Sequence, residues 1–137
     1  MSYEILEHPA DAKFRAVGDS LDEAFSQATE ALGEITGDAA AAYTHEVEVE
    51  SENLGTLLFD YLDRLIFLQD TERIVVAEAS EMDVQEEEDG WRLEAEIKAD
   101  SIDSETTAMD LKAPTYSGMK AAYEEGEGWV LEAVIDI

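Results

Sequence analysis

The sequence predicts an α+β fold in which two helices pack on one largely antiparallel (mixed) sheet, forming a two-layer sandwich. Two stretches, at about residues 20–37 and 53–69, carry apolar side chains at the i, i+3, i+4, i+7 spacing of an amphipathic helix. Much of the remaining chain alternates polar and apolar residues, which is typical of half-buried strands. The resulting order is strand, strand, helix, strand, helix and then four or so strands, which implies an α+β domain.

Alternating stretches and chain-breaking residues locate the strands. Pro9 ends the first strand because proline lacks a backbone N–H, and Gly18 ends the second. Pro114 indicates that the segment around it lies at a sheet edge or bulge. We expect strands at residues 3–7, 12–17, 45–50, 74–84, 91–99, 121–123 and 129–137.

The two helices have recognisable ends and faces. Ser20 and Glu23 have the spacing of a capping box, in which the serine side chain accepts from the backbone and the glutamate reaches back to it. Gly37 is a suitable stop for this first helix. In the second helix, Phe59 and Phe67 widen the apolar stripe, so we expect this helix to be covered on more than one side.

Three segments read as loops. Residues 38–43 are alanine-rich, and residues 86–90 form an acidic hairpin turn that lacks the ligand spacing of a calcium-binding hand. The segment from Asp100 to Asp110 has no periodicity and many serine, threonine and acidic residues. Its length suggests that it has a function, although no particular role can be assigned to it.

Length and composition favour a single domain spanning 1–137. The chain has 137 residues, 45% of them hydrophobic, which suffices for one core. The absence of cysteine excludes disulfides, thiol nucleophiles and cysteine-ligated metal sites. No apolar run approaches the ~20 residues of a membrane span, and no leader-like segment opens the chain, so we expect a soluble, cytoplasmic protein without membrane partners.

The charge is strongly negative. Asp and Glu number 35 against 8 Lys and Arg, a formal net charge of -27, and the acids are spread along the whole chain. Molar salt shortens the Debye length to about 3 Å and screens such repulsion, so we interpret the composition as halophilic adaptation, as in archaea with a saline cytoplasm. Because this surface repels phosphates, we expect a basic protein partner and no tight direct binding of nucleic acid.

The last predicted strand suggests a metal site. It places the side chain of Asp136 beside the α-carboxylate of Ile137, and like charges so close call for a cation or a shared proton. Asp11, expected in the turn after the first strand, is the candidate third member. Three oxygen donors suit Ca²⁺ or Mg²⁺ better than zinc. Two plainer interpretations remain open: Asp11 as a turn residue after Pro9, and Asp136 as a solvated strand residue.

No catalytic motif indicates an enzyme. The chain has no glycine-rich phosphate loop and no Gly-x-Ser-x-Gly elbow. His8 and His45 are the only histidines; we interpret His45 as a surface residue and His8 as a residue that orients the turn bearing Asp11. A metal-dependent hydrolase built on the same carboxylates stays an alternative, although it lacks a clear general base beyond His8. A general holdase-type chaperone is the second alternative, and its mark would be an exposed apolar patch.

Three segments of the chain carry a resemblance to known proteins. They are the opening Tyr3–Asp11, the block Lys112–Met119 and the ending Val134–Ile137, with further similarity in Ser20–Phe25 and Asn53–Asp70. Together they resemble the archease family. The resemblance implies a chaperone-like, non-enzymatic activator of the tRNA-splicing RNA ligase, which helps the ligase to accept GMP and to turn over many times. It also implies a divalent-metal site on Asp11, Asp136 and the terminal carboxylate of Ile137, with Ca²⁺ as first choice and Mg²⁺ or Mn²⁺ as alternatives.

Two positions depart from the family pattern. The family usually has Thr-Tyr-His-Gly where this chain has Thr115 to Gly118, so Ser117 replaces a histidine. The family's usual His-Thr-Ala-Asp is here His8-Pro9-Ala10-Asp11. Any contact that the missing histidine makes with metal or ligase is lost or changed in this chain.

Overall fold

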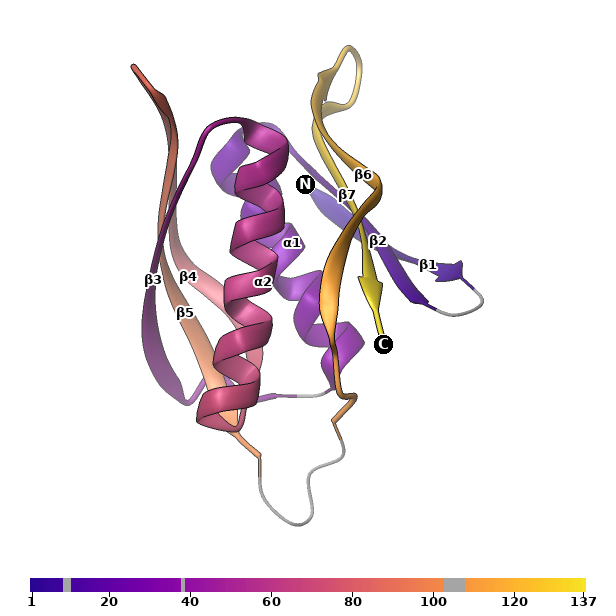
Figure 1. Ribbon diagram of the computed structural model, residues 1–137, viewed down its shortest axis with the longest axis vertical. Helices are drawn as coiled ribbons and strands as arrows, with labels where there is room; N and C mark the ends of the chain where they lie inside the picture. The colour runs from indigo at the N-terminus through magenta and orange to yellow at the C-terminus, as the bar shows by residue number, and fades with distance from the viewer. Residues whose placement is uncertain (9–10, 38, 103–107) are drawn as a thin grey trace.

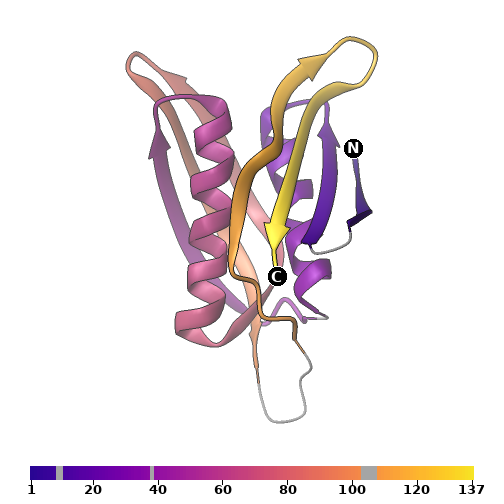
Figure 2. The same ribbon diagram turned by 45° about the vertical axis from the view of Figure 1, so that its right-hand side comes forward.

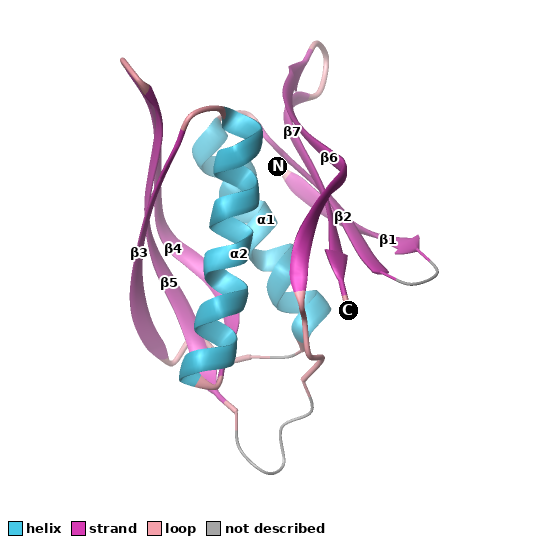
Figure 3. Ribbon diagram, in the orientation of Figure 1, coloured by secondary structure: helices cyan, strands magenta, loops and turns pink. Residues whose placement is uncertain are grey.

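The computed structural model describes residues 1–8, 11–37, 39–102 and 108–137. Two helices and seven strands make up this part of the chain (Figures 1 and 3). The helices are α1 (Leu21–Thr36) and α2 (Leu54–Glu72). The strands are β1 (Ser2–His8), β2 (Asp11–Gly18), β3 (Tyr43–Ser51), β4 (Ile74–Glu87), β5 (Gly90–Ser101), β6 (Ala113–Glu124) and β7 (Gly128–Asp136).

The strands form two antiparallel sheets. Sheet A has the order β1-β2-β7-β6, and sheet B has the order β3-β5-β4. Figures 1 and 2 show both helices between the two sheets: α1 packs on β2 and β4, and α2 packs on β6 and β3. The predicted α+β class is thus confirmed, but its arrangement differs, since two antiparallel sheets enclose the helices where one mixed sheet in two layers was expected.

The burial of α1 explains why one sheet does not suffice. Its buried residues fall on nearly all sides of the helix, from Ala24 to Thr36. On the side of sheet B, a Cβ at Gly33 would lie 2.3 Å from the carbonyl oxygen of Val76, so β4 runs directly against the helix backbone. On the side of sheet A, Phe14 of β2 is fully buried. A helix with so wide a buried surface needs a cover on both sides.

Buried hydrogen bonds connect the helices within this core. The hydroxyl groups of Thr29 in α1 and Tyr61 in α2 lie 2.6 Å apart, and burial raises the pKa of Tyr61, which keeps its phenol neutral. Gln69 of α2 donates to the hydroxyl of Thr36 and accepts from the backbone N–H of Val76, at 3.2 and 3.0 Å. The side chain of Gln69 therefore connects α1, α2 and β4, and its buried amide group is satisfied.

Local details refine the predicted boundaries. The hydroxyl of Ser20 accepts from the N–H of Glu23 as predicted, but the carboxylate of Glu23 accepts from the N–H of Asp19 rather than that of Ser20. Gly37 caps the end of α1, as expected. β6 begins at Ala113, earlier than predicted, and it is an edge strand, as the proline indicated. Of the predicted loop 100–110, residues 100 and 101 belong to β5, and 103–107 lie outside the described residues.

Candidate functional site at one end of sheet A

The pairing of β2 with β7 places the two predicted aspartates opposite each other. Asp11 is the first residue of β2 rather than a turn residue, Asp136 is the last residue of β7, and the two are cross-strand partners. Directly opposed residues point to the same face, with Cβ atoms about 4.5–5.5 Å apart. Asp11 is half-buried and Asp136 is exposed. Ile137 follows β7 directly, and 37% of its surface is exposed.

A row across all four strands of sheet A contains this pair. His8 of β1 is the partner of Asp11, and Ala113 of β6 is the partner of Asp136. The backbone N–H of Lys112 donates to the carbonyl oxygen of Asp136 at 2.9 Å, which fixes the end of β7 beside β6. The main chain thus holds the Asp136 position on both sides, and Asp11 opens the strand next to it.

Further along the same face, one arginine contacts three acidic side chains. Arg15 of β2 lies opposite Glu132 of β7 and contacts it at 3.4 Å. The same guanidinium reaches Glu127 at 2.6 Å and Glu124 at 3.6 Å. The row of Asp11 and Asp136 contains no lysine or arginine. Arg15 thus lies among three carboxylates at its own end of the face.

The donor chemistry of this end fits a hard cation. Two carboxylates and the α-carboxylate predicted at Ile137 supply only oxygen, which Ca²⁺, Mg²⁺ and Mn²⁺ accept. Within the described ranges, no three His, Cys, Asp or Glu residues come together in a way that could hold a metal ion. The predicted set has two such side chains, so it would depend on the terminal carboxylate and on water or a partner to complete a coordination shell. That Asp11, Asp136 and Ile137 form a metal site remains a prediction.

The segment with Ser117 lies beside this end of the sheet. Between Thr115 and Lys120, β6 bulges out of register with β7, and Gly118 adopts a positive φ of 76°. A Cβ at Gly118 would lie 3.2 Å from a methyl group of Val134, two residues before Asp136. Ser117 itself is exposed. Pro114 predicted a sheet edge or a bulge in this segment, and the structure has both; Gly118 within a strand-like stretch is a further sign of the bulge.

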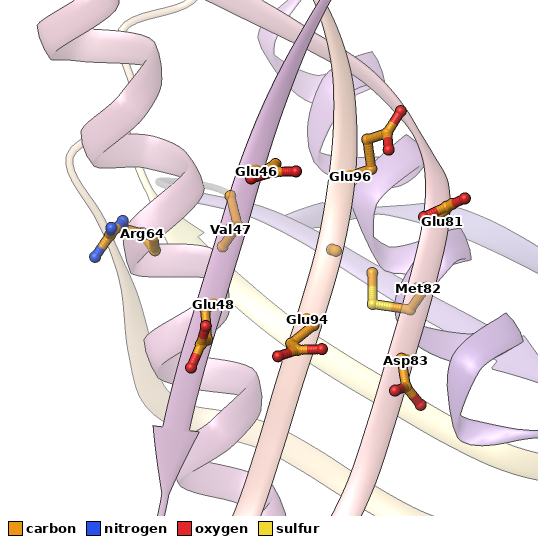
Figure 4. A pocket seen from close by; sticks show the side chains of 10 residues that line it. Glu46, Val47, Glu48, Arg64, Glu81, Met82, Asp83, Glu94 and Glu96 are labelled. Atoms are coloured by element: carbon orange, nitrogen blue, oxygen red, sulfur yellow. The ribbon is translucent and has the colours of Figure 1, made fainter.

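A concave region lies on the other sheet, sheet B. Its volume is about 670 Å³, and Figure 4 shows carboxylates on all three strands around it. Arg64 of α2 is the only cation among its lining residues, which are Glu46, Val47, Glu48, Arg64, Glu81, Met82, Asp83, Glu94, Ala95 and Glu96. These lining residues include no histidine, and we interpret the region as a solvated acidic face.

Arg92 of β5 holds part of this acidic face together. Its guanidinium contacts Glu94 at 2.6 Å and Glu48 at 2.8 Å. The hydrogen bond with Glu94 and the negative charges of Glu48, Glu94 and Glu50 raise the pKa of Arg92, so this side chain stays charged.

None of the helices in the described residues combines the length and apolar character that crossing a membrane requires.

Comparisons with known proteins point to one family. The model of the Archease protein family (MTH1598/TM1083) matches residues 3–137. The protein archease of Pyrobaculum neutrophilum is 33% identical over 141 residues, which cover 98% of this chain and 95% of that protein. The protein archease of Pyrococcus abyssi is also 33% identical, over 98% of both chains.

Solved structures agree with these sequence matches. The solution structure of protein 1598 of Methanobacterium thermoautotrophicum is 31% identical, with a TM-score of 0.84 over 99% of both chains. A crystal structure from Thermotoga maritima, described as an archease and possible chaperone, has a TM-score of 0.62 over 96% of this chain and 94% of that chain. At 20% identity, that second likeness shows the fold alone. None of these descriptions names an enzymatic activity.

Proposed function

This chain belongs to the archease family, and from this premise we propose that it is a chaperone-like activator of the tRNA-splicing RNA ligase. It promotes transfer of GMP to the ligase and so allows each ligase molecule to join many RNA ends. The chain itself joins no RNA. The observation that carries the proposal is the opposition of Asp11 and Asp136 in sheet A, within a chain that matches the family over residues 3–137.

Asp11, Asp136 and the terminal carboxylate of Ile137 would hold a divalent cation, with Ca²⁺ as first choice. When bound, the cation neutralises the opposed carboxylates and offers open coordination positions, since Ca²⁺ typically takes six to eight oxygen ligands. The chain's own contribution is to hold the two aspartates in place: β2 and β7 fix their backbones, and the N–H of Lys112 fixes the carbonyl group of Asp136. These residues face the solvent side of sheet A, where a partner protein can reach them.

The charge of the chain supports a basic protein partner. With a net charge of -27, the surface repels RNA and attracts the basic rim of a nucleic-acid enzyme. The same charge suits a protein that acts in a saline cytoplasm, where salt screens the repulsion among its own carboxylates. We therefore propose that this chain binds the ligase protein directly and does not bind the RNA.

Turnover of the ligase tests this proposal. RNA ligation is measured with limiting ligase from the same organism, with GTP, divalent metal and molar salt, in the presence and absence of this chain. We expect product to rise from about one per ligase molecule to many. Product that stays at about one per ligase would show that this chain is not a turnover activator.

A general holdase is a second candidate because large apolar side chains are exposed, among them Phe67 and Tyr116 at 59% and 63%. A holdase protects unrelated proteins from aggregation, whereas a ligase activator acts on one partner. Light scattering of a heated unrelated client, with and without this chain in high salt, separates the two. We expect no protection; protection at equimolar chain would favour the holdase.

A further inference from the structure

An exposed aromatic surface joins α2 to β6. The ring of Tyr116 in β6 stacks on the ring of Phe59 in α2, with ring centroids 4.0 Å apart and planes 2° from parallel. Tyr116 is 63% exposed in spite of this contact, so much of the ring is open to solvent. Two turns along α2, Phe67 is 59% exposed. Figures 1 and 2 show that β6 runs beside α2.

The bulge of β6 builds this surface. Thr115 pairs with Val134 and Lys120 with Glu132, so the four residues 116–119 face a single position of β7. Gly118 takes the positive φ that the bulge requires. As a result, Tyr116 leaves the ladder of sheet A and lies on α2. The ring of Tyr116 is thus held against Phe59.

Acidic residues alternate with the aromatic rings. Phe59, Asp63, Phe67 and Asp70 follow one another at spacings of three or four residues, which places them along one stripe of α2. Asp63 and Asp70 are exposed, and no ion pair within the described ranges includes either of them. We call this stripe, together with Tyr116, the α2 face. It presents flat apolar rings with a carboxylate within one helical turn of each.

We propose that the α2 face docks an arginine-bearing segment of a partner protein. A guanidinium group can stack on an aromatic ring and at the same time donate hydrogen bonds to a carboxylate, which a lysine ammonium does less well. The alternation of rings and carboxylates on the α2 face matches both needs. In taking the ligase as that partner, the inference rests on the proposed function.

Two other occupants fit the charges poorly. RNA bases could stack on Tyr116, but the phosphates would lie near Asp63 and Asp70 and be repelled. A second copy of this chain would bring the same aspartates toward each other across the contact. An arginine-bearing segment is the occupant that uses the rings and the carboxylates together.

Binding of this chain to the ligase tests the inference. The dissociation constant is measured by biolayer interferometry for the parent and for the double variant Tyr116→Ala/Phe67→Ala. We expect at least about tenfold weaker binding from the loss of two aromatic anchors. Tyr116→Phe keeps the ring and should bind like the parent. Tyr43→Ala, which removes an aromatic ring of similar exposure (57%) in β3, is the matched control and should change binding less than twofold.

Failure of the inference is distinct from failure of the proposed function. If the parent binds the ligase and the double variant binds equally well, the inference is wrong while the proposed function stands. If the parent does not bind the ligase, the partner is wrong, and a triarginine peptide is compared with a trilysine peptide by NMR titration of this chain. Larger shifts at Phe67 and Tyr116 with triarginine support the inference, and equal shifts overturn it. Binding of single-stranded RNA that is lost in Tyr116→Ala would overturn it too, in favour of base stacking.

Discussion

At the scale of single residues, the opposition of Asp11 and Asp136 is the feature that needs a physical reason. Like charges directly opposite each other in an antiparallel pair destabilise it by some tenths of a kcal/mol. The sequence placed Asp136 beside the α-carboxylate of Ile137 and offered Asp11, after the first strand, as a third member, and the family resemblance implied the same set. The direct pairing of Asp11 with Asp136 depends on the register of β2 with β7, which no local pattern specifies.

Calcium should therefore stabilise the fold through these carboxylates. At a concentration about 100 times its dissociation constant, a ligand that binds only the folded state adds about 2.7 kcal/mol. We expect the unfolding midpoint of the parent to rise with calcium in differential scanning calorimetry. Asp136→Asn should lose this rise and, without calcium, should be at least as stable as the parent. Glu87→Gln, at the far end of β4, is the control and should keep the rise.

Glu30 of α1 makes stability depend on pH. Burial and the charge of Glu78 raise its pKa above the ordinary value of 4.5, and the hydrogen bond from Gln27 opposes this only in part. The folded state therefore holds the proton of Glu30 more tightly than the unfolded chain does. The contribution of Glu30 to stability falls as pH rises from 4.5 to the raised pKa of the folded state, and it is constant at higher pH.

Replacing this carboxyl group removes that penalty. Glu30→Gln should gain stability relative to the parent as pH rises from 4 to 7, measured by urea unfolding at each pH. Glu72→Gln, which removes one charge at an exposed position, is the control. A difference between Glu30→Gln and the parent that stays constant over this range would contradict the account.

At the scale of elements, periodicity predicts the helices and strands well because it reflects local burial. The serine cap and the glycine stop of α1 are local signals of the same kind. The division of seven strands into two sheets is not local: it depends on which distant strands pair, and β3 pairs with β5 rather than with its neighbours in the chain. The breadth of apolar positions on the helices was the only sequence signal for a second sheet, and it was wrong in part, since Phe67 of α2 is 59% exposed.

The close approach of β4 to α1 makes Gly33 a sensitive position. Gly33→Ala would place a methyl group 2.3 Å from the carbonyl oxygen of Val76, a backbone atom that cannot move aside. We expect a loss of about 1–3 kcal/mol in the free energy of unfolding. Gly55→Ala in α2 is the control, because the nearest atom to its new methyl group lies 3.5 Å away. That variant should be neutral or gain up to about 1 kcal/mol; equal losses at both positions would contradict the packing described.

At the scale of the whole molecule, the net charge of -27 opposes compaction. Among the described residues, most ion pairs involve Arg15 or Arg92, and 8 Lys and Arg cannot neutralise 35 Asp and Glu. Added salt screens the remaining repulsion. We expect the unfolding midpoint to rise steeply up to about 1 M NaCl, where the Debye length is about 3 Å, and to level off beyond it. A midpoint that does not change between 0.1 and 1 M would contradict this view.

The central claim is that the opposed aspartates of sheet A act in turnover of the ligase. The most direct measurement is multiple-turnover RNA ligation with limiting ligase and either the parent, Asp136→Asn or the control Glu87→Gln, all shown to be folded by circular dichroism. The account predicts that the parent and the control raise product to many per ligase molecule and that Asp136→Asn leaves it near one. Full stimulation by Asp136→Asn would contradict the claim.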